Sequence, residues 1–248
     1  MGTLEWKGEA LNEGQILERE FAIETEAGPI PGIVWMPEEI EEPVPLVLFG
    51  HGGSGHKRAS RAVMLGRRLA GVSQYAMVAI DGPAHGGRQG PRLEDLYAEK
   101  GFDNVIDGMV GDWMATLDCF SGMDTIDENR VGYVGFSMGC RFGLPFVAAA
   151  GDRLRCAALG KNALARRGET DANDALGDRF RRDAPNVRVP VFFHLQWDDE
   201  LFARESQCDL FDLIDSQDKR MVCYTGPHGR SSPEAVDDWC RFLKRSLG

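Results

Sequence analysis

Several features that would set the chain apart from ordinary globular proteins are missing. No apolar run approaches the roughly 18 residues that a membrane-spanning helix requires. The N-terminal sequence MGTLEWKGEALNEGQ lacks the basic and then apolar pattern of a signal peptide. Glycine and proline are spread along the chain rather than gathered in one tract. We therefore expect a cytoplasmic protein with an ordinary folded core and no membrane partner.

Excess positive charge and paired cysteines are also absent. The chain has 28 Lys and Arg residues and 39 Asp and Glu residues, which gives a net charge of -11. This sign opposes binding to phosphate backbones, so nucleic acid is not an expected partner. The six cysteines form no C-x-x-C pair and no zinc-ribbon spacing, and we interpret them as reduced thiols.

What the chain does contain is an alternation of short apolar runs and helix-like stretches over 248 residues, enough for a single domain, 1–248. Apolar runs predict interior strands at 44–49, 75–80, 131–136, 155–159, 190–195 and 220–224. Helices are predicted at 58–71, 104–122, 138–150, 201–215 and 233–246. This alternation predicts the α/β class, with a mostly parallel central sheet and helices on both faces.

Two segments depart from the alternation. Residues 20–36 contain β-branched residues interrupted by Gly-Pro and Pro-Gly pairs, which predicts an antiparallel hairpin before the parallel strands. Residues 161–188 are polar and highly charged, and they separate two predicted strands. We interpret 161–188 as an excursion over the sheet edge, either a short cap over a pocket or a mobile loop.

The clearest chemical motif follows the strand 131–136 directly. Gly135-Phe136-Ser137-Met138-Gly139 is a G-x-S-x-G sequence between a predicted strand and a predicted helix. A sharp turn there leaves no room for side chains beside the serine and projects its hydroxyl at the carboxyl edge of the sheet. The backbone amide of Met138, at the helix N-terminus, is a candidate oxyanion donor. The alternative is a tight turn in which the serine only caps the helix.

With this motif in its expected context, the chain resembles the α/β-hydrolase superfamily, and within it the branch of dienelactone-hydrolase-like proteins and small carboxylesterases. In that superfamily an acid and a histidine follow the nucleophile in the order Ser, Asp, His. The resemblance implies that the acid follows strand 190–195, where Asp199 is the first candidate and Asp198 the second. It implies that the histidine is His228, in the loop before the last helix.

The resemblance also assigns a second oxyanion donor to the loop after strand 44–49. That loop reads His51-Gly52-Gly53-Ser54-Gly55, and Gly53 is the expected donor, with Ser54 as the alternative. The same stretch approaches a phosphate-binding loop, but His56 intervenes before the lysine that G-x-x-x-x-G-K-[ST] requires. A metal site built from His51, His56 and His85 lacks ligand spacing typical of zinc enzymes, and His85 is interpreted as structural. We therefore expect neither a cofactor nor a metal.

Aromatic residues near these motifs are candidates for the substrate pocket, and all of them are also plausible core residues. The candidates are Phe136, Trp113, Trp197 and Phe202. Arg141, one helical turn after Ser137, is interpreted as a packing or ion-pairing residue, and contact with an acidic substrate is the alternative.

Together these features predict a serine hydrolase that cleaves a small-molecule carboxylic ester through an acyl-enzyme intermediate. Ser137 would be the nucleophile, His228 the general base and Asp199 the residue that orients the histidine. A thioesterase, an amidase or peptidase of the same fold, and a non-catalytic binding protein are the alternatives. A homo-oligomer is compatible with the sequence, which does not fix the oligomeric state.

Overall fold

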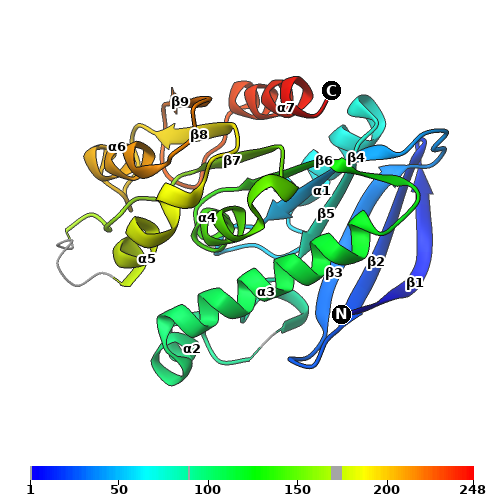
Figure 1. The fold of residues 1–248 in the computed structure, drawn as a ribbon, viewed down its shortest axis with the longest axis horizontal. Coiled ribbons are helices and arrows are strands. Elements are labelled where there is room, and N and C mark those ends of the chain that lie inside the picture. The colour runs from blue at the N-terminus through cyan, green and yellow to red at the C-terminus, as the bar shows by residue number, and fades with distance from the viewer. Residues whose placement is uncertain (1, 89, 169–174) are drawn as a thin grey trace.

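The structure of the protein is a computed structural model that describes residues 2–88, 90–168 and 175–248. Its centre is a nine-stranded sheet with helices on both faces (Figure 1). The strands are β1 (Thr3–Glu13), β2 (Ile16–Glu24), β3 (Ile30–Pro37), β4 (Val44–Gly50), β5 (Ala76–Ile80), β6 (Ile126–Gly135), β7 (Cys156–Gly160), β8 (Val191–Gln196) and β9 (Lys219–Tyr224). The α-helices are α1 (Ser60–Arg68), α2 (Leu93–Lys100), α3 (Phe102–Ser121), α4 (Met138–Ala150), α5 (Ala175–Asp183), α6 (Arg204–Leu213) and α7 (Pro233–Leu247).

The strand order is β1-β2-β3-β5-β4-β6-β7-β8-β9. Strands β4 to β9 pair in parallel, whereas β1, β2 and β3 join the sheet in antiparallel pairs. This arrangement confirms the predicted α/β class with a mostly parallel sheet. None of the described helices is both long enough and apolar enough to cross a membrane.

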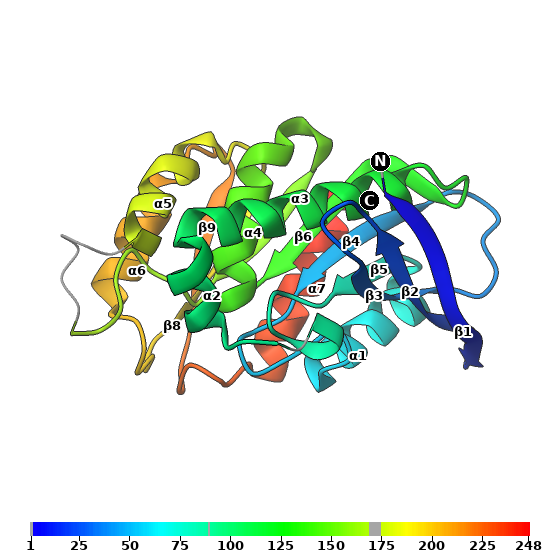
Figure 2. The ribbon, with the colours of Figure 1, turned by 90° about the horizontal axis from the view of Figure 1, so that it is seen from below.

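The helices form two layers because the interior strands are apolar on both faces. Figure 2 shows α1 and α7 beneath the sheet and α3 and α4 above it. The stripe predicted for the last helix is confirmed, since Val236, Trp239, Phe242 and Leu243 of α7 are all buried in one cluster with α1. Residues of α3 and α4 belong to the second cluster, on the other face.

The N-terminal hairpin is confirmed as β2 and β3, but the structure adds the edge strand β1, which the sequence did not predict. β1 pairs with β2 and is exposed along nearly its whole length. Only Leu4 and Trp6 of β1 are apolar residues that alternate and contact the core, and this alternation is too short to predict a strand. The helix α2 was missed for a similar reason, since Leu93 is its only buried residue.

The charged segment 161–188 is partly ordered into the core. Ala163, Leu164 and Ala165 are buried, and α5 packs Leu176 and Phe180 into the same cluster as α3 and α4. The predicted cap or mobile loop also includes residues 169–174, which lie outside the described residues. The short 3₁₀ turn Ala184–Asn186 then leads into β8.

Candidate active site

The register of the parallel strands brings four loops to one place at the carboxyl edge of the sheet. Gly50 at the end of β4 is paired with Gly135 at the end of β6. Gln196 at the end of β8 is paired with Tyr224 at the end of β9. Because parallel strands end at the same edge, the loops that carry the serine, the acid, the histidine and the glycine-rich sequence all begin there.

The turn that carries Ser137 is strained and tightly packed. Ser137 has φ 58° and ψ -120°, a conformation that non-glycine residues rarely adopt and that typically costs about 1–3 kcal/mol. The amide of Ser137 donates to the carbonyl oxygen of Gly160 at 3.1 Å, and Asn162 Nδ2 donates to the carbonyl oxygen of Ser137 at 2.9 Å. A Cβ on Gly139 would lie 2.2 Å from the carbonyl oxygen of Gly50, so this motif position has room only for glycine.

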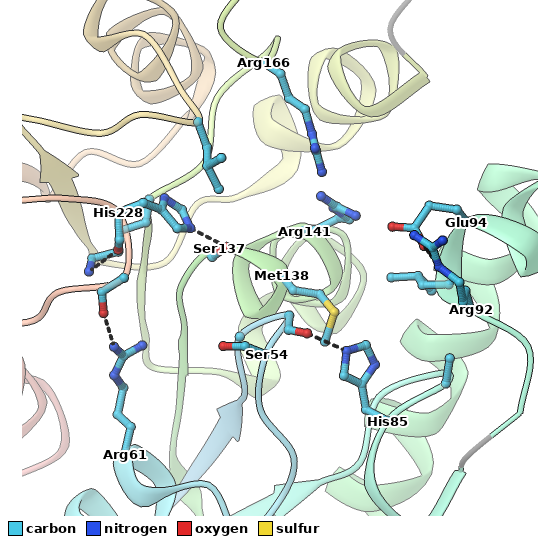
Figure 3. A pocket seen from close by; sticks show the side chains of 17 residues that line it. Ser54, Arg61, His85, Arg92, Glu94, Ser137, Met138, Arg141, Arg166 and His228 are labelled. Carbon is cyan, nitrogen blue, oxygen red and sulfur yellow. Dashed lines mark hydrogen bonds and ion pairs between the residues drawn. The ribbon is translucent and has the colours of Figure 1, made fainter.

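His228 joins the serine to an acid through both ring nitrogens. Ser137 Oγ lies 2.8 Å from Nε2, and Asp199 Oδ2 lies 2.8 Å from Nδ1 (Figure 3 shows the serine contact). The side chain of Asp199 is fully buried. Burial by itself raises the pKa of Asp199, but hydrogen bonds from His228 and from the amides of Leu201 and Phe202 outweigh it and lower that pKa. Asp199 therefore faces His228 as a carboxylate, which fixes the ring proton on Nδ1.

The two neighbouring acids make other contacts. Asp198 Oδ2 accepts a hydrogen bond from the amide of Gly226 at 2.7 Å, and Glu200 Oε2 accepts one from the amide of His228 at 2.8 Å. Both hold the backbone of the histidine loop and leave the imidazole to Asp199. The structure thus places the first sequence candidate, and not its alternative Asp198, against the ring of His228.

The glycine-rich loop lies beside the start of α4. A Cβ on Gly53 would lie 3.9 Å from Cβ of Met138, so the two predicted oxyanion donors are neighbours. Within the described parts of the chain, neither the Gly53 amide nor the Met138 amide has a protein acceptor. His85 Nε2 lies 2.8 Å from the carbonyl oxygen of Gly53 and therefore holds this loop, as its structural interpretation requires.

His51 holds the same loop through hydrogen bonds at both of its ring nitrogens. Its Nε2 accepts the amide of Gly82 at 2.9 Å, so its ring proton is on Nδ1, which donates to the carbonyl oxygen of Gly52 at 2.9 Å. Burial is the main cause that lowers the pKa of His51 to about 4. The ring therefore stays neutral and acts as a fixed link between the two loops.

Three buried polar side chains that sequence reasoning missed support the histidine loop. Lys161 is 1% exposed, and its Nζ donates to the carbonyl oxygens of His228 and Arg230 and to Ser231 Oγ. Burial is the main cause that lowers the pKa of Lys161 to about 7. The only sequence signal was a lysine directly after a predicted strand, and that lysine lies within the segment that was interpreted as an excursion over the sheet edge.

The other two are Gln196 and His194, at the end of β8. Gln196 Nε2 donates to the carbonyl oxygens of Thr225 and Gly226, at 3.1 and 2.7 Å. Its Oε1 lies 2.9 Å from His194 Nε2, and Trp239 Nε1 donates to His194 Nδ1 at 3.2 Å. Burial is the main cause that lowers the pKa of His194 to about 3, so this chain of hydrogen bonds contains a neutral imidazole.

Ser137 and His228 open onto a cavity of about 520 Å³. Its walls carry many charged groups, and its lining includes Ser54, Arg61, His85, Arg92, Glu94, Arg141, Lys161, Arg166 and Leu201 (Figure 3). None of the four aromatic residues expected in the pocket lines it.

The aromatic prediction is corrected because each of those side chains is used elsewhere. Trp113 and Phe136 pack in the cores on opposite faces of the sheet. Phe202 is 2% exposed and lies behind His228, with ring centroids 5.7 Å apart. Trp197 is 48% exposed and stacks on Arg204, 4.2 Å from its ring centroid. Three of the four aromatic residues are thus buried in the protein interior, the fourth lies at the surface, and many of the residues that line the cavity are charged.

Comparisons with solved structures place the fold in a known superfamily. A cold-adapted esterase from an Arctic intertidal metagenomic library superposes with a TM-score of 0.84 at 29% identity, over 98% of this chain and 100% of the other. Acetyl xylan esterase 1 from Thermoanaerobacterium sp. gives 0.74 at 16%, over 100% and 89%. S-formylglutathione hydrolase from Agrobacterium tumefaciens gives 0.69 at 15%, over 97% and 99%.

The chain has the α/β-hydrolase fold, as the sequence motif indicated. Its structural neighbours include esterases and other hydrolases, which supports ester hydrolysis in general. No protein-family model matches the sequence, and the comparison with curated proteins gives no match.

Proposed function

We propose that this protein is a serine hydrolase that cleaves a carboxylic ester through an acyl-enzyme intermediate. The observation that carries the proposal is the imidazole of His228, which lies 2.8 Å from Ser137 Oγ and 2.8 Å from the carboxylate of Asp199. A serine hydroxyl is a weak nucleophile at neutral pH and needs an adjacent base. The buried carboxylate orients that base and stabilises the imidazolium that forms.

In the first half of the reaction, Ser137 Oγ attacks the ester carbonyl carbon while His228 Nε2 takes the hydroxyl proton. The negative charge that develops on the carbonyl oxygen is stabilised by the amides of Gly53 and Met138, which lie together and have no other acceptor among the described residues. The intermediate then collapses, the carbon–oxygen bond to the alcohol breaks, and His228 returns the proton to the departing alcohol.

In the second half, His228 removes a proton from water, which attacks the acyl group on Ser137. Collapse of this intermediate releases the carboxylic acid, and the proton returns to Ser137 Oγ. Every proton is carried by His228, so the scheme requires neither a cofactor nor a metal. The esterase at 29% identity supports an ester as the substrate over an amide.

The proposal is tested with p-nitrophenyl esters from acetate to decanoate. We expect turnover by the wild type and its loss in Ser137→Ala and in His228→Ala, on the order of 10⁴-fold or more. Ser60→Ala is the matched control, because it removes an exposed hydroxyl at the first residue of α1. Full activity in a folded Ser137→Ala variant would contradict the proposal.

A fluorophosphonate label gives a second readout that does not depend on choosing the right ester. We expect the mass increment on the peptide that contains Ser137, and none in Ser137→Ala. If Ser137 is labelled but oxygen esters are not hydrolysed, the serine nucleophile is supported and the substrate is instead a thioester or an amide.

A further inference from the structure

The wall of the cavity on the Arg141 side carries a concentration of positive charge that the mechanism does not use. Arg141 comes from α4, Arg166 from the loop after β7 and Arg92 from the residue before α2. Figure 3 shows Arg92 and Glu94 away from His228, with the guanidinium groups of Arg141 and Arg166 directed toward each other. These arginines gather at one cavity although the chain as a whole has a net charge of -11.

Arg141 has unused hydrogen-bonding capacity. Its Nε is buried and has no hydrogen-bond partner among the described residues. Among the described residues, its guanidinium makes one long polar contact, from Nη1 to the hydroxyl of Tyr97 at 3.4 Å. A buried N–H group without an acceptor destabilises the folded protein, so the position is expected to gain an acceptor when the cavity is filled.

Arg166 lines the same cavity, and its guanidinium is directed toward that of Arg141 (Figure 3). In the ranges 2–88, 90–168 and 175–248, no carboxylate lies within ion-pairing distance of either guanidinium. Glu94, which also lines the cavity, pairs with Arg92 at 3.6 Å, where both side chains are exposed. Two like charges that face one another without a counter-ion repel, and an anion between them removes that repulsion.

The remaining cations of the cavity are already engaged with the histidine loop. Arg61 Nη2 donates to the carbonyl oxygen of Gly229 at 3.1 Å, and Lys161 donates to the carbonyl oxygen of His228 at 3.0 Å. The unused capacity is therefore specific to Arg141 and Arg166.

We propose that Arg141 and Arg166 form a subsite for an anionic group, a carboxylate or a phosphate, carried by the ester substrate. Both groups present oxygen atoms that match the planar donors of guanidinium. Arg141 follows Ser137 by one helical turn, roughly 6 Å along the axis, so a spacer of a few atoms connects the reacting ester to the anion. The proposal rests on the proposed ester hydrolysis and names the class of ester.

The test compares esters that differ only in charge. On the acyl side the pair is p-nitrophenyl hydrogen glutarate and p-nitrophenyl methyl glutarate. On the alcohol side the pair is 2-acetoxyethyl phosphate and its dimethyl ester, with acid release followed by titration. We expect kcat/KM to be at least about 10-fold higher for the anionic member of one pair, and the pair that responds identifies which part of the substrate carries the anion.

The variants are Arg166→Gln, which changes an exposed residue, and Arg141→Gln. In each variant we expect the ratio of kcat/KM for the anionic ester to that for the neutral ester to fall about 10-fold, mainly because KM for the anionic ester rises. In the wild type we expect the same ratio to fall at high salt. Arg188→Gln is the matched control, because it removes an equally charged but 76% exposed side chain that pairs with Asp215 far from the cavity lining. Its ratio should equal that of the wild type.

Binding of free glutarate and of inorganic phosphate to Ser137→Ala, measured by calorimetry, separates this proposal from the catalytic one. Binding that is lost in the Ser137→Ala/Arg166→Gln double variant supports the subsite even if no ester is hydrolysed, in which case only the proposed function fails. Ratios near one for both pairs, with no binding of either anion, would overturn the subsite while leaving ester hydrolysis intact.

Discussion

Around Ser137, the side chains on the His228 side of the cavity are joined by short hydrogen bonds, whereas the guanidinium groups on the Arg141 side have few protein partners. His228 is held by Asp199 at 2.8 Å, and its backbone is held by Glu200 and Lys161. Within the part of the chain that the structure describes, no acceptor lies at the buried Nε of Arg141. Proton transfer requires catalytic groups that are held in position before the substrate binds. Recognition of a substrate requires hydrogen-bond donors that have no protein acceptor and can therefore bind the substrate. The two sides of the cavity show these two requirements next to each other.

The largest expected effect is on the His228 side, at its buried acid. Asp199→Asn should lower kcat on the order of 10⁴-fold, because the amide no longer holds the imidazole in the reactive tautomer. Asp198→Asn is the matched change one residue away, and it affects only the contact to the Gly226 amide. We expect it to lower kcat less than about 10-fold. Steady-state kinetics on one p-nitrophenyl ester checks both, and the opposite ranking would reassign the acid.

The next effect concerns the lysine that supports the histidine loop. Lys161→Met should lower kcat about 10²-fold with little change in KM, because a displacement of His228 by an ångström or less affects proton transfer more than binding. Lys219→Met is a close control, since Lys219, like Lys161, donates to three oxygen atoms, here the carbonyl oxygens of Phe211, Asp212 and Ile214. Lys219 is the first residue of β9, so it lies at the amino end of the strand, whereas the site lies at the carboxyl ends of the strands.

Both lysine variants are expected to lose some stability, so their unfolding curves are recorded beside the kinetics. Wild-type kcat in folded Lys161→Met, or an equal loss in Lys219→Met, would remove Lys161 from the positioning of the site.

A smaller effect follows from the neutral buried histidines beneath the site. The pKa of His194 is lowered to about 3 and that of His51 to about 4, both mainly by burial, whereas the unfolded chain protonates histidine near pH 6.5. Between about pH 4 and 6.5 the unfolded state therefore binds more protons than the folded state, and stability falls as pH falls. Each histidine contributes up to about 1.4 kcal/mol per pH unit in this window.

Urea unfolding at pH 7, 6 and 5 measures this slope directly. His194→Gln should reduce it by the contribution of one proton, while it lowers stability at pH 7 through the lost contact to Trp239. An unchanged slope in His194→Gln would mean that the wild-type ring is protonated in the fold.

The smallest effect is expected outside the cavity. Trp197→Ala should change kcat/KM less than about twofold, because this side chain is 48% exposed and stacks on Arg204 away from the lining. Leu201→Ala, in the same loop, removes a side chain that does line the cavity. We expect it to shift the preferred acyl length in the p-nitrophenyl series several-fold. A larger effect of Trp197→Ala would support the sequence prediction that this residue contacts the substrate.

Local patterns were sufficient for most of the fold. Apolar runs predicted five of the six parallel strands to within one residue at each end. β6 begins five residues before the predicted strand, because its first half is polar and mostly unburied. The glycines around Ser137 predicted the sharp turn. The structure shows why Gly139 is needed there, since the backbone of Gly50 leaves no space for a Cβ at that position. Patterns failed where a structural element makes few apolar contacts, as with β1 and α2.

The sequence by itself therefore determined the α/β class with a mostly parallel sheet and the sharp turn at Ser137, because hydrophobic periodicity and glycine sterics act between residues that are close along the chain. The order of the candidate serine, acid and histidine followed from the resemblance to the α/β-hydrolase superfamily. Only the tertiary structure decided that Asp199 rather than Asp198 meets His228, that Lys161 is buried beneath the histidine loop, and that arginines rather than aromatic rings line the cavity. Those outcomes depend on strand register and on packing between distant segments, where a shift of one residue exchanges one side chain for another.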